Sequence, residues 1–160
     1  MPKLDAVSIA RLTGVDPDTV RVVVRAAELT AQPFKVLEGV RSKARQIQLY
    51  GQGRTQAELK AKGVDPVYAK PEMPKVTWTL NSNHFVRADG YGYAVDLVPY
   101  PVDWNTPSKF DAIAKAMFAA GAELGVEIRW GADWDQDGKP RERGESDSPH
   151  FERVKKINGA

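Results

Sequence analysis

The spacing of apolar and polar residues along the chain predicts two longer helices and a series of short strands. Apolar residues recur at helical spacing over residues 17–30 and 106–125, which is typical of amphipathic helices that cover a core. Asp16 and Pro17 supply the N-cap and the first-turn proline that mark the start of the first of these helices. The remaining pattern predicts shorter helices over residues 8–12 and 43–50, and strands over residues 34–38, 76–80, 93–98, 126–130 and 151–157.

This order of elements indicates the fold class. Helices lead and short strands dominate the second half, so we expect an α+β fold with a small, mainly antiparallel sheet and packed helices. Neither an internal repeat nor a boundary between domains is visible, so one domain is expected over residues 1–160. Residues 54–75 are polar and rich in lysine and proline. We expect them to form an exposed excursion with one or two helical turns at residues 56–62.

The amino-acid composition excludes several kinds of functional site. The 160 residues are 42% hydrophobic and 28% charged, as in an ordinary soluble globular protein. The chain contains no cysteine, which excludes disulfides, thiolate ligands and a cysteine nucleophile, so any metal must be held by nitrogen and oxygen. A formal net charge of +2 without strong clustering does not indicate nucleic-acid binding. No apolar run is long enough for membrane insertion, and the early charges in residues 1–12 do not fit a secretory signal.

The rarest chemically active residues suggest a metal site. His84 and His150 are the only histidines in the chain, and Asp96 lies in the apolar run of residues 94–97. Two histidines and one carboxylate from distant segments make the type of ligand set found in catalytic zinc sites, which keep a fourth position open. Rarity alone does not establish that these three side chains meet.

Several motifs resemble one enzyme family. Residues 82–84 (SNH) followed by residues 92–96 (GYAVD) resemble the S-x-H…G-x-A-x-D signature of zinc-dependent D-Ala-D-Ala and L-alanyl-D-glutamate peptidases, whose fold is shared with the hedgehog signalling domain. The phage endolysin branch of this family is similar in three further segments, which are residues 38–41 with 45–46, residues 49–55, and residues 130–134 leading to 147–152. The resemblance runs in order from about residue 14 to residue 152.

The resemblance implies a zinc site. His84, Asp96 and His150 would bind one Zn²⁺ per chain, which would activate a water molecule and polarise the scissile carbonyl. Along the sequence, His84 follows one β-prone segment, Asp96 lies in the next predicted strand and His150 lies at the start of the last predicted strand. We therefore expect three adjacent strand ends to bring these ligands together.

The resemblance also implies the catalytic and substrate-binding residues. Asp147, three residues before His150, corresponds to the acid that takes the proton of water and passes it to the leaving amine. Arg41 is expected to stabilise the oxyanion or to bind a substrate carboxylate, with a structural ion pair as the alternative. Ser82 is expected to contact the substrate or a metal ligand.

The chain departs from the usual motif in one place. His84 and Gly92 are eight residues apart instead of three, which indicates a loop insertion at the rim of the site. The insertion contains Asp89, a rival ligand. We favour Asp96, because a strand holds a ligand more rigidly than a loop. The run DWDQDG at residues 133–138 resembles a calcium loop, but Gly144 stands at the twelfth position, where such a loop carries glutamate.

These implications lead to a functional hypothesis. We expect a zinc metallopeptidase that hydrolyses the peptidoglycan stem peptide, as an L-alanyl-D-glutamate endopeptidase used in host lysis. The alternatives are a D-Ala-D-Ala carboxypeptidase and a non-catalytic zinc-containing binding module, against which the acid at Asp147 argues. The protein is expected to be a monomer that accumulates in the host cytoplasm without a signal peptide and acts on periplasmic peptidoglycan after release.

Overall fold

The computed structural model describes residues 4–77, 80, 84–142 and 147–154, and the structural statements below concern those residues. None of their helices is long and apolar enough to cross a membrane. In chain order the elements are α1 (Ala6–Arg11), α2 (Pro17–Leu29), β1 (Phe34–Glu38), α3 (Lys43–Gly51), α4 (Gln56–Ala61), the 3₁₀ helix η1 (Pro66–Tyr68), β2 (Ala94–Pro99), α5 (Pro107–Leu124), β3 (Ile128–Trp130) and β4 (His150–Arg153).

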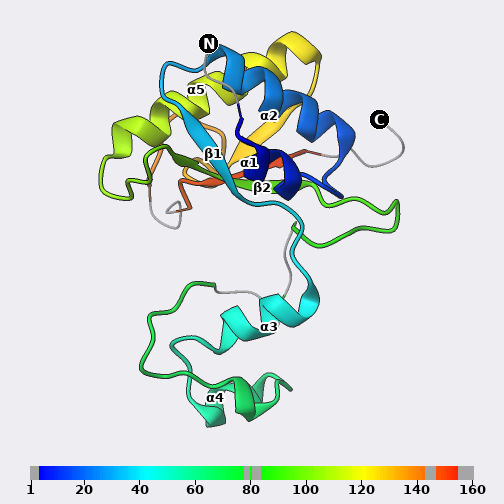
Figure 1. Ribbon diagram of the computed structural model, residues 1–160. Helices are drawn as coiled ribbons and strands as arrows, with labels where there is room; N and C mark the ends of the chain where they lie inside the picture. The colour runs from blue at the N-terminus through cyan, green and yellow to red at the C-terminus, as the bar shows by residue number, and fades with distance from the viewer. Residues whose placement is uncertain (1–3, 78–79, 81–83, 143–146, 155–160) are drawn as a thin grey trace.

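The four strands form one antiparallel sheet in the order β1-β2-β4-β3. Helices α2 and α5 pack against each other and cover one face of this sheet (Figure 1). Asp16 caps α2 by accepting a hydrogen bond from the Thr19 amide at 3.0 Å, and Gly125 ends α5 in the left-handed conformation. The α+β class with a small antiparallel sheet is therefore confirmed.

The main apolar core lies between the sheet and these two helices. Val36, Leu97 and Phe151 project from three strands, and Val23 and Ile113 project from α2 and α5 to meet them. All five side chains have almost no contact with solvent. Because the apolar residues of the sheet fill this face, its other face is left for polar side chains.

A second, smaller apolar cluster lies in the segment from α3 to η1, away from the helical face of the sheet (Figure 1). Its buried members are Tyr50, Leu59 and Val64. The helical turns expected at residues 56–62 are confirmed as α4, but the expectation that the rest of residues 54–75 is exposed is only partly right. Val64 and Arg54 are buried. An isolated valine and a buried arginine leave no periodic apolar pattern to detect.

The strand expected over residues 76–80 is wrong for Val76, Thr77 and Leu80, which lie outside any strand, and residues 78–79 are not described. The side chain of Thr77 instead accepts a hydrogen bond from Gln46 Nε2 at 3.0 Å. A β-prone composition forms a strand only where a sheet edge is available to pair with it. The last strand begins one residue earlier than predicted, at His150, and residues 155–157 lie outside the described chain.

The contact between α5 and the sheet predicts a large stability effect. Ile113→Ala should lower the free energy of unfolding by about 2–5 kcal/mol, because it removes a fully buried side chain and leaves a cavity. Lys115→Ala, an exposed position in the same helix, is the matched control and should leave stability unchanged. Urea denaturation of the two variants measures the difference. Equal stability of both would contradict this position of α5.

Candidate functional site

The open face of the sheet carries two of the predicted ligands. Asp96 of β2 lies directly opposite His150 of β4 in the antiparallel register. The strand neighbours Val95 and Leu97 are buried in the main core, so alternation along β2 directs Asp96 to the other face. Phe151, which follows His150, is likewise in the core. Strand pairing and alternation together therefore bring the carboxylate and the imidazole to the same point.

His84 reaches this point from a loop, not from a strand end as expected. Its Nδ1 lies 2.7 Å from the carbonyl oxygen of Gly39, and its own carbonyl oxygen accepts a hydrogen bond from the Arg41 amide at 2.9 Å. The loop is therefore held against the segment that follows β1. Gly92 makes this close packing possible, since a Cβ atom there would lie 2.9 Å from the carbonyl oxygen of His84.

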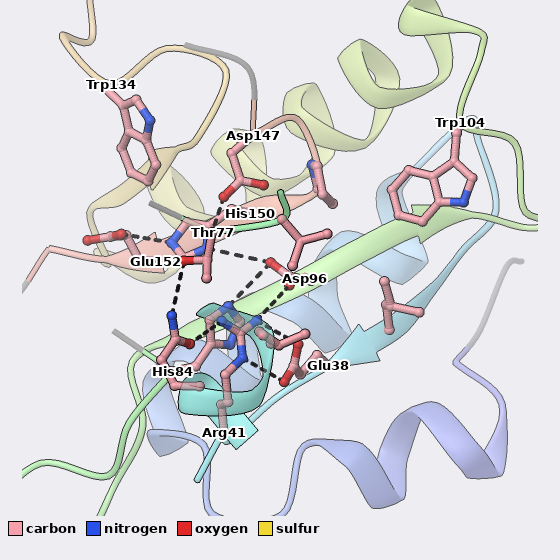
Figure 2. Close-up of a pocket in the computed structure, with 15 residues that line it drawn as sticks. Glu38, Arg41, Thr77, His84, Asp96, Trp104, Trp134, Asp147, His150 and Glu152 are labelled. Carbon is pink, nitrogen blue, oxygen red and sulfur yellow. Dashed lines mark hydrogen bonds and ion pairs between the residues drawn. The ribbon is translucent and has the colours of Figure 1, made fainter. Parts of the chain in front are cut away.

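The ring nitrogens of the two histidines point to the same carboxylate oxygen of Asp96. Oδ1 of Asp96 lies 3.3 Å from His84 Nε2 and 3.5 Å from His150 Nδ1, distances too long for good hydrogen bonds (Figure 2). One ligand atom from each residue lies within 4.8 Å of the others. Because His84 Nδ1 faces a carbonyl and His150 Nε2 faces the Glu152 carboxylate, the remaining ring nitrogens present lone pairs to Asp96 in the neutral rings. A metal cation fits this arrangement of three electron-pair donors.

The electrostatics agree with a cation site. Burial disfavours the charged form of Asp96, but its interactions with His150 and His84 outweigh burial and hold its pKa well below the usual range. Burial also disfavours the imidazolium of His150, yet its contacts with Asp96 and Glu152 raise its pKa to about 9. In the absence of metal, a proton on His150 therefore balances the buried carboxylate, and a bound cation would replace that proton.

Arg41 lies beside the three converging residues, and its guanidinium already forms hydrogen bonds with other side chains. Its Nε and NH2 groups donate to the two carboxylate oxygens of Glu38 at 2.8 and 2.6 Å, and NH1 donates to Gln46 at 2.7 Å. NH2 also lies 3.6 Å from Oδ2 of Asp96. The guanidinium is thus fixed next to the carboxylate of Asp96, and the ion-pair alternative describes part of what Arg41 does.

Asp147 projects into the site from the turn before β4. Its Oδ2 lies 3.8 Å from His150 Nδ1, and burial among its surroundings raises the pKa of its carboxyl. The turn is fixed by a hydrogen bond from the Asp147 amide to the Gly131 carbonyl at 3.2 Å and by one from Trp130 Nε1 to Ser148 at 2.7 Å. A Cβ atom at Gly131 would collide with the backbone oxygen of Asp147. The glycine in the W-G-A-D-W motif therefore allows the turn to approach β3.

These residues line a cleft of about 570 Å³, which lies between the open face of the sheet and α3. Trp134 and Trp104 stand at its sides (Figure 2). The Trp134 ring lies 5.3 Å from the ring of His150, whereas Trp104 is 54% exposed and stacks on Phe110. A cleft with convergent polar groups and aromatic walls is the usual form of an active site.

Of the two other expected site residues, one does not join this group and the other is not described. Asp89, the rival ligand, accepts hydrogen bonds from the Tyr91 amide and the Tyr93 hydroxyl and is exposed, so the convergent carboxylate is that of Asp96. Ser82 lies outside the described residues, and its contact with the substrate stays a prediction.

A separate acidic group lies in the loop after β3. Asp133, Asp135 and Asp137 each bring a carboxylate oxygen within 4.8 Å of the others. Burial and the neighbouring carboxylates raise the pKa of Asp133, although it accepts a hydrogen bond from the Gly138 amide at 3.0 Å. Spacing alone did not predict this clustering, because a calcium loop would carry glutamate where Gly144 stands.

Comparisons with known proteins identify the family. The model of the phage L-alanyl-D-glutamate peptidase family matches residues 1–154. The chain belongs to this family. It is 31% identical over 150 residues to the L-alanyl-D-glutamate peptidase of Escherichia phage T5, covering 90% of this chain and 92% of that protein. Its structure resembles the crystal structure of the Serratia marcescens L-Ala D-Glu endopeptidase ChiX with a TM-score of 0.62 and 31% identity, covering 93% of this chain and 87% of that one.

Sequence reasoning missed several residues around the site of this peptidase. Glu38 and the Gly39 carbonyl, which orient Arg41 and His84, belong to a quoted motif but had no assigned role. Glu152, the last residue of the quoted segment 147–152, contacts the ring of His150. Its spacing from His150 by two residues in a strand was the available signal, since such residues share a face.

The choice between the two candidate carboxylates can be tested directly. In this peptidase, Asp96→Ala should abolish tight binding of a divalent metal because it removes the carboxylate on which both ring nitrogens converge. Asp89→Ala removes the same group from the loop and should leave metal binding intact. Metal content after dialysis, measured by mass spectrometry, compares the two. Loss of metal from Asp89→Ala with retention in Asp96→Ala would reverse the assignment.

Proposed function

We propose that this member of the phage L-alanyl-D-glutamate peptidase family is a zinc-dependent endopeptidase that cleaves the peptidoglycan stem peptide. The observation that carries the proposal is the convergence of His84 Nε2, His150 Nδ1 and Asp96 Oδ1 beside the carboxylate of Asp147. Two imidazoles and one carboxylate suit a catalytic zinc ion, with a coordination position left for water or substrate. Zinc, when bound, supplies a Lewis acid that polarises the scissile carbonyl and lowers the pKa of water.

Asp147 is proposed as the general base and acid. It lines the cleft, and its half-exposed carboxylate would accept a proton from the attacking water as the new C–O bond forms at the L-alanyl carbonyl. The same proton would pass to the amine nitrogen of D-glutamate as the C–N bond breaks, which returns Asp147 to its ionised form. Burial shifts the pKa of the Asp147 carboxyl upward, which is the direction that helps it hold the proton between the two steps.

Arg41 is proposed to interact with the substrate through its positive charge. The Glu38 and Gln46 contacts use several of its N–H groups and fix the plane of the guanidinium at the edge of the cleft. A positive charge held there would stabilise the oxyanion of the tetrahedral intermediate or bind a carboxylate of the substrate. Ser82 is proposed as a further substrate contact.

The biological setting is a separate proposal. We propose a single-domain monomer that accumulates in the host cytoplasm and reaches periplasmic peptidoglycan after release by another protein. Membership of a phage peptidase family supports a role in host lysis. The endopeptidase reaction is preferred to the D-Ala-D-Ala carboxypeptidase alternative because the family and both similar proteins carry the L-alanyl-D-glutamate name.

Digestion of purified muropeptides followed by mass spectrometry tests the proposed reaction. The expected product is a stem-peptide fragment with a new N-terminal D-glutamate. A chelator should abolish its formation, and added zinc should restore it. Release of a single terminal D-alanine would instead identify a carboxypeptidase, and full activity in the chelated protein would contradict the role of the metal.

The role of Asp147 predicts a separation of metal binding from catalysis. Asp147→Asn should retain zinc and the fold, because the three converging ligand atoms are untouched, but it should lose at least about 100-fold in turnover because it cannot accept the proton. Glu72→Gln removes an exposed carboxylate outside the cleft and serves as the control. Muropeptide turnover and zinc content are measured on the same samples. Wild-type turnover by Asp147→Asn would show that another group is the base.

A further inference from the structure

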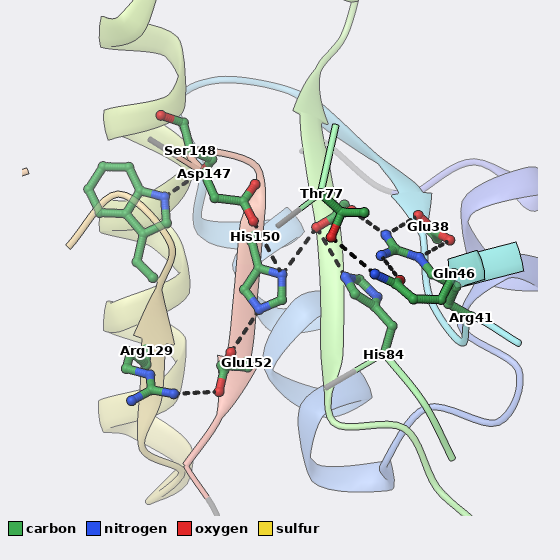
Figure 3. Close-up of polar contacts among 12 residues, drawn as sticks. Glu38, Arg41, Gln46, Thr77, His84, Arg129, Asp147, Ser148, His150 and Glu152 are labelled. Atoms are coloured by element: carbon green, nitrogen blue, oxygen red, sulfur yellow. Dashed lines mark hydrogen bonds and ion pairs between the residues drawn. The ribbon is translucent and has the colours of Figure 1, made fainter. Parts of the chain in front are cut away.

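We propose that Glu152, held by Arg129, is a positioning residue that fixes the ring of His150 with Nδ1 directed to the metal. The proposal rests on the zinc site described above, but the relevant contacts belong to the protein alone. Oε1 of Glu152 lies 2.8 Å from His150 Nε2, and Oε2 accepts a hydrogen bond from Arg129 NH2 at 2.8 Å (Figure 3).

The sheet builds this row of side chains through its register. Asp96 of β2 lies opposite His150 of β4, and Glu152 of β4 lies opposite Arg129 of β3. His150 and Glu152 are two residues apart in the same strand, so they lie on one face. Three adjacent strands therefore hold a continuous line from the ligand carboxylate through the imidazole to the guanidinium.

Burial makes the contact between Glu152 and His150 strong and directional. The Glu152 side chain is 5% exposed and that of His150 is 9% exposed. A buried carboxylate is costly unless both of its oxygens have partners, and here the imidazole and the guanidinium provide one each. A carboxylate that faces Nε2 requires a proton on that nitrogen, so the lone pair of the neutral ring is on Nδ1, the atom 3.5 Å from Asp96 Oδ1.

The same contact restricts rotation of the ring. An imidazole could turn about its Cβ–Cγ bond and exchange the positions of its two nitrogens. Turning would break the 2.8 Å hydrogen bond between Nε2 and the buried carboxylate of Glu152. A carboxylate partner also makes a ligating histidine more basic, so it strengthens the bond to a metal as well as orienting it.

Arg129 of β3 holds the carboxylate of Glu152 in place. Its guanidinium neutralises the carboxylate and lies 5.2 Å from the centre of the Trp134 ring, which in turn lies 5.3 Å from the ring of His150. Arg129 therefore acts on the metal site indirectly, chiefly through Glu152, and its removal should have a smaller effect than removal of Glu152 itself.

Zinc affinity measured by competition with a chromogenic chelator tests the proposal. Glu152→Ala should raise the dissociation constant about 10–100-fold, the usual effect of removing a partner of a ligating histidine. Glu152→Gln, which keeps the shape and one acceptor oxygen, should fall between Glu152→Ala and the wild type. Glu127→Gln removes a carboxylate from an exposed position next to β3 and should bind zinc like the wild type. Circular dichroism confirms that each variant is folded.

A second measurement separates this proposal from the zinc proposal. In the metal-free wild-type protein, proton NMR should detect the Nε2–H of His150 as a slowly exchanging downfield resonance, retained in Glu127→Gln and lost in Glu152→Ala. Failure of the wild type to bind zinc would overturn the metal site, while the NMR signal would still decide the contact. Wild-type affinity in both Glu152 variants, or absence of the resonance from the wild type, would overturn the role of Glu152.

Discussion

The cross-strand pairing of Asp96 with His150 is the constraint on which the site depends. Strand alternation places Val95 and Leu97 in the core, so β2 cannot shift by one residue without burying Asp96 among apolar side chains and exposing its neighbours. The free energy of burying the core therefore also fixes the register of Asp96 and His150, the two proposed ligands on these strands. Phe151, which lies in the same core, locks β4 in the same way.

The loop residues His84 and Arg41 are held beside the Asp96–His150 pair by contacts with the end of β1 and the segment after it. His84 is held by Gly39 and Arg41, and Arg41 is held by Glu38 at the end of β1. The irregular register between β1 and β2 at Val36 and Glu38 occurs where the strand leaves the sheet for this segment. A bulge at that position redirects the chain, so the arginine and the carbonyl that orients His84 reach the same side as Asp96.

The sequence predicted those features that local pattern controls. The helical period of α5 and the alternation of β1 follow from burial of one face, and each could be recognised within a few residues. The position of His84 could not, because its contact with Gly39 joins residues 45 apart in the chain. The small cluster around Leu59 was also hidden, since its apolar members are too widely spaced to form a period. The proposed ligand set came from family resemblance, which carries long-range information that a single pattern lacks, and the structure brings its three side chains together.

The charges around the cleft favour the binding of a divalent cation at the proposed metal site. Among the described residues, four carboxylates meet here, from Glu38, Asp96, Asp147 and Glu152, against the guanidinium groups of Arg41 and Arg129. With both histidines neutral, two negative charges remain unbalanced, which is the charge of one divalent ion. Protonation of His150 removes only one of them, and it does so at the nitrogen that faces Asp96. A divalent cation among the three converging atoms would balance the remaining charge and satisfy the buried oxygen of Asp96 at once, so the proposed metal would bind where the folded sheet already brings its donors together.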